Sequence, residues 1–164
     1  MADIVDAGVQ GLLDLVPVLR LGDLHAGDRE DVAAVEGRIV RQREREVAMG
    51  CVDFGASRHV ARIILAALRF DPRTRAAVNI RYSEKVLAAC RETGLTVSSF
   101  EREKEPENVS SMDWGTTEAI RAYGSVPNVI YDEGGTGKEP MVRLLGTSAT
   151  EIAKLAVKLA GSLE

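Results

Sequence analysis

The sequence predicts an α/β fold, and three adjoining segments carry this prediction. Residues 79–82 and 95–100 contain β-branched and aromatic side chains, which favour strands. Between them, Ser83 can cap a helix over residues 84–91, and Gly94 fits the position just after the end of that helix. A strand, a helix and a second strand in this order form one α/β unit.

Length and composition are those of a single globular domain, residues 1–164, that can bury a core. Hydrophobic residues make up 45% of the chain and charged residues 28%. The net charge of −4 argues against a general nucleic-acid partner, and glutamates interrupt the basic run over residues 38–45. No apolar run reaches the length of about 18 residues that spans a membrane, so a membrane partner is not expected.

Cysteine and histidine usage favours a cytoplasmic protein without a zinc site. Cys51 and Cys90 lack metal-binding spacing and are expected to be free thiols in a reducing compartment. The N-terminus lacks the basic flank and apolar core of a signal peptide. With His25 and His59 as the two histidines, any metal would be held by oxygen ligands.

The first 50 residues predict a helix followed by loops and one extended segment. Residues 3–16 have the spacing of an amphipathic helix that Pro17 ends. Residues 19–29 are expected to be loop, and residues 32–34 a short turn. Residues 37–49 have the pattern of an exposed hairpin or a charged edge strand.

The C-terminal half is predicted to alternate between loops, helices and strands. The expected order is loop 101–111, helix 116–124, strand 126–131, loop 132–140, strand 141–145 and a final helix that Ser148 and Glu151 open as a capping box.

A glycine turn leading into an amphipathic helix is the stretch with the clearest chemistry. Gly55 suits a tight turn and Ser57 an N-cap, and the apolar stripe behind them comprises Val60, Ile63, Ile64, Ala67 and Leu68. Free amides and the helix dipole make such a terminus an anion site, to which His59 and Arg62 add phosphate-binding side chains. The alternative is an ordinary capped helix with His59 and Arg62 on its surface.

The acidic, glycine-rich segment 132–140 is not a Walker P-loop, because Asp132 stands where the first glycine is needed and Glu139 follows Lys138. Its carboxylates could hold Mg²⁺ while Lys138 meets a phosphate. The alternative is a β-hairpin connection with solvated charges.

Cationic side chains that suit more than one phosphate are spread over the chain: Arg38, His59, Arg62, Arg81 and Lys138. Candidates to stack on a flat ring, or else to fill the core, are Phe54, Tyr82, Phe100 and Trp114.

Five short motifs occur in order: Gly37-Arg38-Ile39-Val40, Phe54-Gly55-Ala56-Ser57-Arg58-His59, Asn79-Ile80-Arg81-Tyr82-Ser83, Trp114-Gly115, and Tyr131-Asp132-Glu133-Gly134 through Gly137-Lys138-Glu139-Pro140. Together they resemble the archaeal-type thiamine-phosphate synthase family, the ThiN domain, over roughly residues 28–160. Separated motifs in register are far more specific than any one of them.

The resemblance implies a three-layer α/β/α fold with a mixed sheet, like that of class II aldolases. It implies a transferase that joins hydroxymethylpyrimidine diphosphate to hydroxyethylthiazole phosphate with Mg²⁺, giving thiamine monophosphate and diphosphate. Arg38 and His59 correspond to the family's catalytic residues. Substrate and phosphate binding would fall to Gly55, Ala56, Ser57, Arg58, Arg62, Asn79, Arg81 and Lys138, and metal binding to Asp132 and Glu133.

One segment departs from the family pattern and leaves an alternative function open. Residues 15–27 differ from the segment that precedes the Gly-Arg motif in relatives, so the chain could instead be a sensor domain that binds thiamine phosphate without catalysis. The partners that the resemblance implies are a second copy in a homodimer and a pyrimidine kinase, fused or separate.

Overall fold

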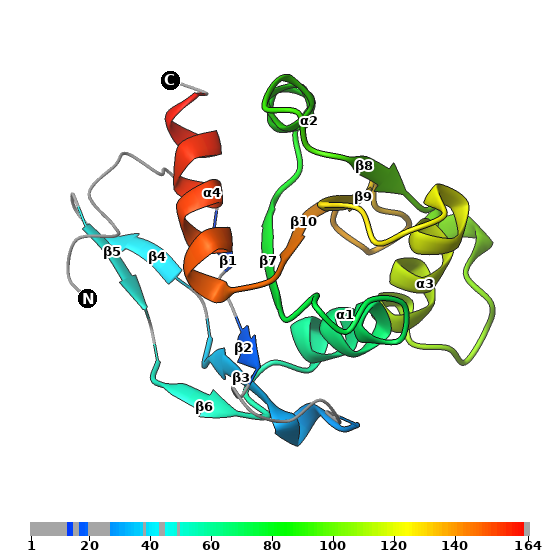
Figure 1. Ribbon diagram of the computed structural model, residues 1–164, viewed down its shortest axis with the longest axis horizontal. Helices are drawn as coiled ribbons and strands as arrows, with labels where there is room; N and C mark the ends of the chain where they lie inside the picture. The colour runs from blue at the N-terminus through cyan, green and yellow to red at the C-terminus, as the bar shows by residue number, and fades with distance from the viewer. Residues whose placement is uncertain are drawn as a thin grey trace.

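In the computed structural model, a mixed β-sheet lies between two pairs of α-helices (Figure 1). The structure describes residues 13–14, 17–19, 27–37, 39–42, 45–48 and 50–162, and for residues 13–14, 17–19, 39–42 and 45–48 it describes the backbone alone. Within these ranges, no helix is both long enough and apolar enough to cross a membrane.

Eight of the described strands form one sheet in the order β6-β3-β2-β7-β10-β9-β8, with β1 also paired to β7. Their bounds are Leu13–Asp14 (β1), Pro17–Leu19 (β2), Val32–Val35 (β3), Val52–Phe54 (β6), Ala76–Arg81 (β7), Val97–Ser99 (β8), Val129–Asp132 (β9) and Met141–Gly146 (β10). The β8–β9 pair is parallel and the other described pairs are antiparallel, so the predicted mixed sheet is confirmed.

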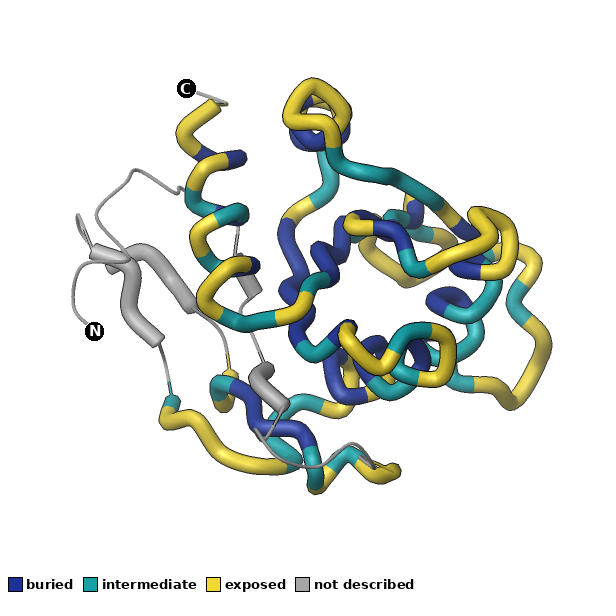
Figure 2. Tube along the Cα trace, in the orientation of Figure 1, coloured by how far each residue is buried: buried dark blue, intermediate teal, exposed yellow. Residues whose placement is uncertain are grey.

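The four α-helices cover both faces of this sheet: Arg58–Leu68 (α1), Glu84–Glu92 (α2), Ser111–Tyr123 (α3) and Ala149–Gly161 (α4). Alternate residues of β7 face opposite ways. Val78 and Ile80 pack with α2 and α4, whereas Ala77 packs with α1 and α3. Figure 2 shows the buried residues concentrated along the central strands. Short 3₁₀ turns occupy Arg29–Asp31 (η1) and Arg102–Lys104 (η2).

The predicted helix after the glycine turn is confirmed as α1. The Ser57 hydroxyl accepts a hydrogen bond from the Val60 amide at 3.4 Å, as an N-cap should. Val60, Ile63, Ile64 and Ala67 are buried against α3 and the sheet. The apolar stripe therefore fixes α1 on the sheet and leaves its N-terminal turn at the surface.

Two predictions for the N-terminal part need correction and one is confirmed. Where a helix over residues 3–16 was expected, Leu13–Asp14 pairs with β7 as a strand, and the first twelve residues lie outside the described ones. The expected turn at residues 32–34 is strand β3, because pairing with β2 and β6 satisfies its backbone on both sides. The predicted hairpin is present as β4 (Ile39–Gln42) and β5 (Arg45–Ala48).

Helix α3 begins at Ser111, five residues before the expected start at Thr116. The sequence signal was masked by Gly115, which disfavours helix interiors. The structure gives the reason for that glycine: a Cβ at Gly115 would lie 2.3 Å from Cε2 of Phe100. The Phe100 ring, packed edge-on against Trp114, therefore needs a glycine in the helix beneath it.

Gly115→Ala is expected to destabilise the protein by about 1–3 kcal/mol, because overpacking outweighs the gain in helix propensity. Gly161→Ala is the matched control, since a Cβ at the end of α4 would meet open space. Urea unfolding of both variants measures the difference. Equal free energies of unfolding for Gly115→Ala and the wild type would contradict the packing argument.

Candidate active site

A cavity of about 450 Å³ opens where the N-terminal turn of α1 meets β7, β10 and the start of α3. The residues that line it are Val35, Gly37, Ser57, His59, Val60, Asn79, Arg102, Ser111, Met112, Lys138, Glu139 and Met141. Four residues predicted for substrate binding or catalysis are thus brought together from three distant segments: Ser57, His59, Asn79 and Lys138.

His59 stands in the first turn of α1 and is the histidine of this cavity. Partial desolvation, followed by the charges of Arg62, Arg102 and Arg143, lowers the pKa of His59 below its ordinary value of 6.5. The imidazole is therefore neutral at pH 7 in the ligand-free protein. An anion bound beside it would raise this pKa and favour the imidazolium.

The affinity for inorganic pyrophosphate, relative to that of His59→Gln, is expected to increase as the pH falls. The gain is complete below the pKa of His59 in the free protein and is lost as the pH rises through the higher pKa of the complex. Isothermal titration calorimetry between pH 5 and 8 measures both proteins, and the variant corrects for titration of pyrophosphate itself. A ratio of affinities that does not change with pH would exclude His59 from anion binding.

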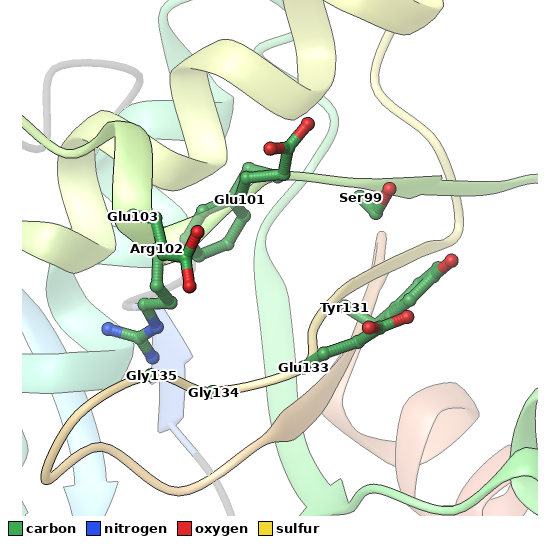
Figure 3. Close-up of a pocket in the computed structure, with 9 residues that line it drawn as sticks. Ser99, Glu101, Arg102, Glu103, Tyr131, Glu133, Gly134 and Gly135 are labelled. Atoms are coloured by element: carbon green, nitrogen blue, oxygen red, sulfur yellow. The ribbon is translucent and has the colours of Figure 1, made fainter.

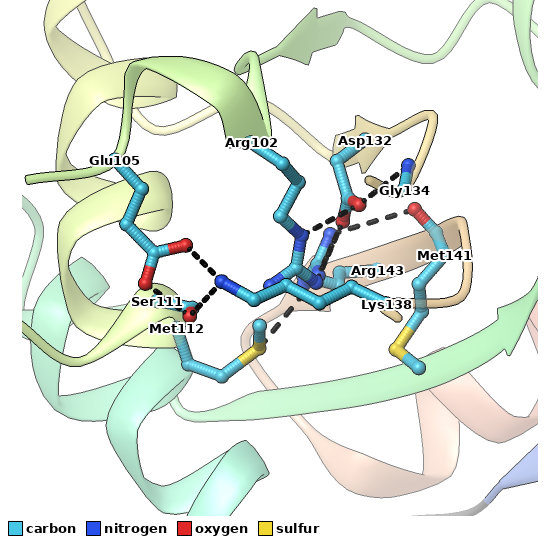
Figure 4. A network of polar contacts seen from close by, with 9 residues as sticks. All are labelled: Arg102, Glu105, Ser111, Met112, Asp132, Gly134, Lys138, Met141 and Arg143. Carbon is cyan, nitrogen blue, oxygen red and sulfur yellow. Dashed lines mark hydrogen bonds and ion pairs between the residues drawn. The ribbon is translucent and has the colours of Figure 1, made fainter. Parts of the chain in front are cut away.

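Asp132, at the end of β9, lies between two arginines (Figure 4). Its Oδ1 accepts from Nε of Arg102 at 2.8 Å, and its Oδ2 accepts from Nη2 of Arg143 at 2.6 Å and from Nη2 of Arg102 at 3.2 Å. Burial alone would raise the pKa of Asp132, but the two guanidinium groups hold it below its ordinary value. We call these three residues the arginine–aspartate cluster.

A second ion pair closes the rim of the cavity. Nζ of Lys138, in the β9–β10 connection, donates to Oε2 of Glu105 at 2.7 Å and to the Ser111 hydroxyl at 3.4 Å. Ser111 in turn donates to Glu105 (Figure 4). The predicted hairpin alternative for residues 132–140 is therefore confirmed as backbone structure, with Gly135 and Lys138 forming a bridge. Its Glu133, Lys138 and Glu139 are exposed, as that alternative expects, whereas Asp132 is fully buried.

Asn79 contributes a polar group from the floor of the cavity. Its side chain lies on the same face of β7 as that of Ala77, and the residue is 6% exposed. Its Oδ1 is buried and has no hydrogen-bond partner among the described residues. An unpaired amide oxygen in a binding cavity is available to a ligand group that donates a hydrogen bond.

A neighbouring cavity of about 470 Å³ lies on the other side of Arg102 (Figure 3). Glu101, Glu103, Tyr131 and Glu133 contribute to its walls, together with Gly134 and Gly135. Arg102 belongs to both cavities, so it marks the place where they meet.

The pair Asp132 and Glu133 does not fit a shared magnesium site. Both oxygens of Asp132 accept hydrogen bonds from arginines, and Oδ1 also accepts from the Gly134 amide at 3.0 Å. Glu133 lines the neighbouring cavity instead. Among the described residues, no three His, Cys, Asp or Glu side chains converge as a metal site. Asp132 thus serves as the shared ion-pair partner of Arg102 in η2 and Arg143 in β10.

The other predicted site residues have varied positions. Gly55, with φ of +72°, donates its amide to the Val32 carbonyl at 3.0 Å, so it serves the turn rather than a phosphate. Ala56, Arg58 and Arg81 are not among the residues that line the cavity described above. Arg62 is exposed one turn along α1, close enough for its charge to act on His59. Arg38 lies outside the described residues, although Gly37 beside it in sequence lines the cavity.

Two functional residues were missed from the sequence. Arg102 falls in a charged segment without periodicity, where one arginine looks like any other surface charge. Arg143 had a signal: it is the charged residue of the otherwise apolar strand Met141–Gly146. A charge in such a run predicts a buried ion pair.

Fold and cavity together define an α/β domain with a cavity at the N-terminus of α1, lined by His59, Arg102 and Lys138 among others. The sequence profile described as "Thiamine-phosphate synthase ThiN" matches residues 20–158. The chain therefore belongs to the ThiN family of thiamine-phosphate synthases, transferases of thiamine biosynthesis.

Relatives and solved structures agree with this membership. The chain is 47% identical over 128 residues to the bifunctional thiamine biosynthesis protein ThiDN of Methanocaldococcus jannaschii, covering 77% of this chain and 30% of that protein. It is 44% identical over 135 residues to the thiamine-phosphate synthase ThiN of Methanothermobacter thermautotrophicus, covering 79% and 71%. The chain thus spans less than a third of the length of the bifunctional relative.

The fold also matches crystal structures. The C-terminal domain of protein MJ0236 superposes with a TM-score of 0.83 at 38% identity, covering 97% of this chain and 88% of that one. The C-terminal domain of a phosphomethylpyrimidine kinase superposes with a TM-score of 0.78 at 34% identity, covering 94% and 86%. A domain of this kind therefore occurs at the C-terminus of a phosphomethylpyrimidine kinase.

Proposed function

We propose that the chain joins hydroxymethylpyrimidine diphosphate to hydroxyethylthiazole phosphate and releases thiamine monophosphate and diphosphate. The observation that carries the proposal is the 450 Å³ cavity of a ThiN family member, where the N-terminus of α1, His59, Lys138 and Arg102 converge. Cations and free helix amides suit both phosphorylated substrates.

In this reaction the bond between the pyrimidine methylene carbon and the diphosphate oxygen breaks, and a bond from that carbon to the thiazole nitrogen forms. Negative charge grows on the departing diphosphate, so preorganised donors lower the barrier. His59 stabilises this charge by donating a hydrogen bond from its imidazole to the leaving oxygen. Arg38 is proposed to share this task, as its place in the family motif implies.

Mg²⁺ dependence is a further proposal, based on the family resemblance and on the usual pairing of Mg²⁺ with substrate diphosphates. The Asp132 carboxylate is occupied by two arginines and Glu133 lines the neighbouring cavity, so the pair does not form a shared metal site. Glu133→Gln is a direct check, because the Mg²⁺ concentration for half-maximal turnover should stay unchanged if Glu133 is not a ligand.

Turnover tests the proposed function. The purified protein is mixed with both substrates and Mg²⁺, and thiamine phosphate is followed after conversion to fluorescent thiochrome. Product that is lost in Arg38→Ala and His59→Ala would support the synthase. Saturable binding of thiamine phosphate without turnover would overturn it in favour of the sensor.

Three further features are proposed on the resemblance alone. The arrangement of helices on both faces of a mixed sheet is compatible with a three-layer fold of the class II aldolase type. A homodimer and a pyrimidine kinase, fused or separate, are the proposed partners, and ThiDN supports the fused form. A cytoplasmic location stays a prediction.

A further inference from the structure

We propose that Arg102 is the principal ligand for the diphosphate, and that Asp132 and Arg143 are positioning residues that aim it. The identity of the anion rests on the proposed function, whereas the presence of an anion site at Arg102 does not. Arg102 has no place in the family motifs described above and was not predicted from the sequence.

The first argument is the geometry of the Arg102 side chain. Asp132 engages Nε and Nη2 through both carboxylate oxygens, at 2.8 and 3.2 Å. Nη1 makes no hydrogen bond to any described residue, so one edge of the guanidinium group is left for a ligand. The paired contact with Asp132 fixes the plane of the group, and a fixed plane makes a directional donor to phosphate oxygens.

The second argument is burial. The Arg102 side chain is 7% exposed, and the side chains of Asp132 and Arg143 are fully buried. Both guanidinium groups also lie over the Phe100 ring, 5.5 Å and 5.2 Å from its centre. A long arginine held in this way has already lost the rotamer freedom that ligand binding would otherwise remove.

The third argument is charge. In the arginine–aspartate cluster two cations share one carboxylate, and Lys138 and Glu105 beside it compensate each other. Glu139 also lines the cavity but is exposed. The cluster itself therefore carries one net positive charge, which is costly to bury without a counter-ion. The carboxylates of the neighbouring cavity, Glu101, Glu103 and Glu133, make no hydrogen bond to Arg102 among the described residues. A bound anion removes this cost.

The fourth argument is position. Arg102 lines both the cavity of His59 and the neighbouring cavity of Tyr131. Its charge reaches His59, whose pKa it helps to lower. A diphosphate bound at Arg102 would thus lie beside the imidazole and at the junction of the two cavities, which gives each organic ring a separate space.

The test is the affinity for inorganic pyrophosphate, measured by calorimetry at constant ionic strength. Arg102→Met is expected to weaken binding about 10- to 100-fold, as the loss of a charge-assisted hydrogen bond does. Lys104→Met is the matched control: Lys104 lies in the same η2 turn, is exposed and pairs with Glu101, and the variant should bind as the wild type does. Guanidinium ion added to Arg102→Met should restore binding of pyrophosphate, because the Asp132 carboxylate remains in place to bind the added ion.

Arg102→Lys covers the case in which Arg102→Met does not fold, as circular dichroism would reveal. The lysine keeps the charge but not the fork, so affinity should fall about 10-fold. Wild-type affinity in whichever of these variants folds would overturn the proposal. Turnover is measured separately. If the wild type makes no thiamine phosphate, but Arg102→Met binds pyrophosphate more weakly than the wild type does, the synthase is refuted and the anion site is supported.

Discussion

His59→Ala is expected to lower kcat for thiamine phosphate formation by about 10²- to 10³-fold, the usual cost of one donor to a developing oxyanion. The imidazole lies in the cavity at the N-terminal turn of α1, among the charges of Arg62, Arg102 and Arg143. Because the leaving diphosphate gains charge in the transition state, the loss should fall on kcat more than on KM.

The thiochrome assay measures this effect, and two further variants define it. His59→Gln keeps an amide donor and should retain part of the activity. Lys85→Ala, exposed on α2 at the other face of the sheet, should leave kcat unchanged. Wild-type kcat in His59→Ala would remove His59 from the reaction.

Asp132→Ala is expected to destabilise the protein by about 3–5 kcal/mol, since it leaves Arg143 buried and without its carboxylate. Adding Arg143→Met to Asp132→Ala removes that buried charge and should recover much of the loss. Burial would raise the pKa of Asp132, but the arginines lower it, so the ion pair persists above pH 3.8, the ordinary pKa of the carboxyl. Its stabilising effect is lost only as the pH falls through the lower pKa of the folded state.

Urea unfolding at pH 7 measures the free energies of unfolding of Asp132→Ala and of the double variant with Arg143→Met, and the same series on the wild type at lower pH follows the loss of the ion pair. Glu118→Ala is the matched control, because Glu118 pairs with Arg121 at the surface of α3 and such pairs contribute about 0–1 kcal/mol. If Asp132→Ala cost no more than this control, the arginine–aspartate cluster would not be a structural centre of the site.

Helix caps and strand positions could be predicted from the sequence where they depend on neighbouring residues in one segment. Ser57 caps α1, Ser83 caps α2 and Ser148 caps α4, as their positions before apolar periodic runs predict. The strands β7, β8, β9 and β10 lie within two or three residues of the predicted ranges. His59, Asn79 and Lys138, which line the cavity, were also predicted as site residues, because each lies in a short motif that can be read from the sequence.

Tertiary contacts decided the rest, because the energies concerned arise between segments far apart in the chain. Val32–Val35 becomes a strand through neighbours on both sides, and Gly115 enters a helix because Phe100 covers it. Asp132 carries a carboxylate that could bind a metal, yet in the fold it forms ion pairs with Arg102 of η2 and Arg143 of β10. The sequence by itself determined the class of fold, the family and the Ser57-capped turn that opens α1. The partner of each buried charge was set only when the sheet brought β9, β10 and η2 together.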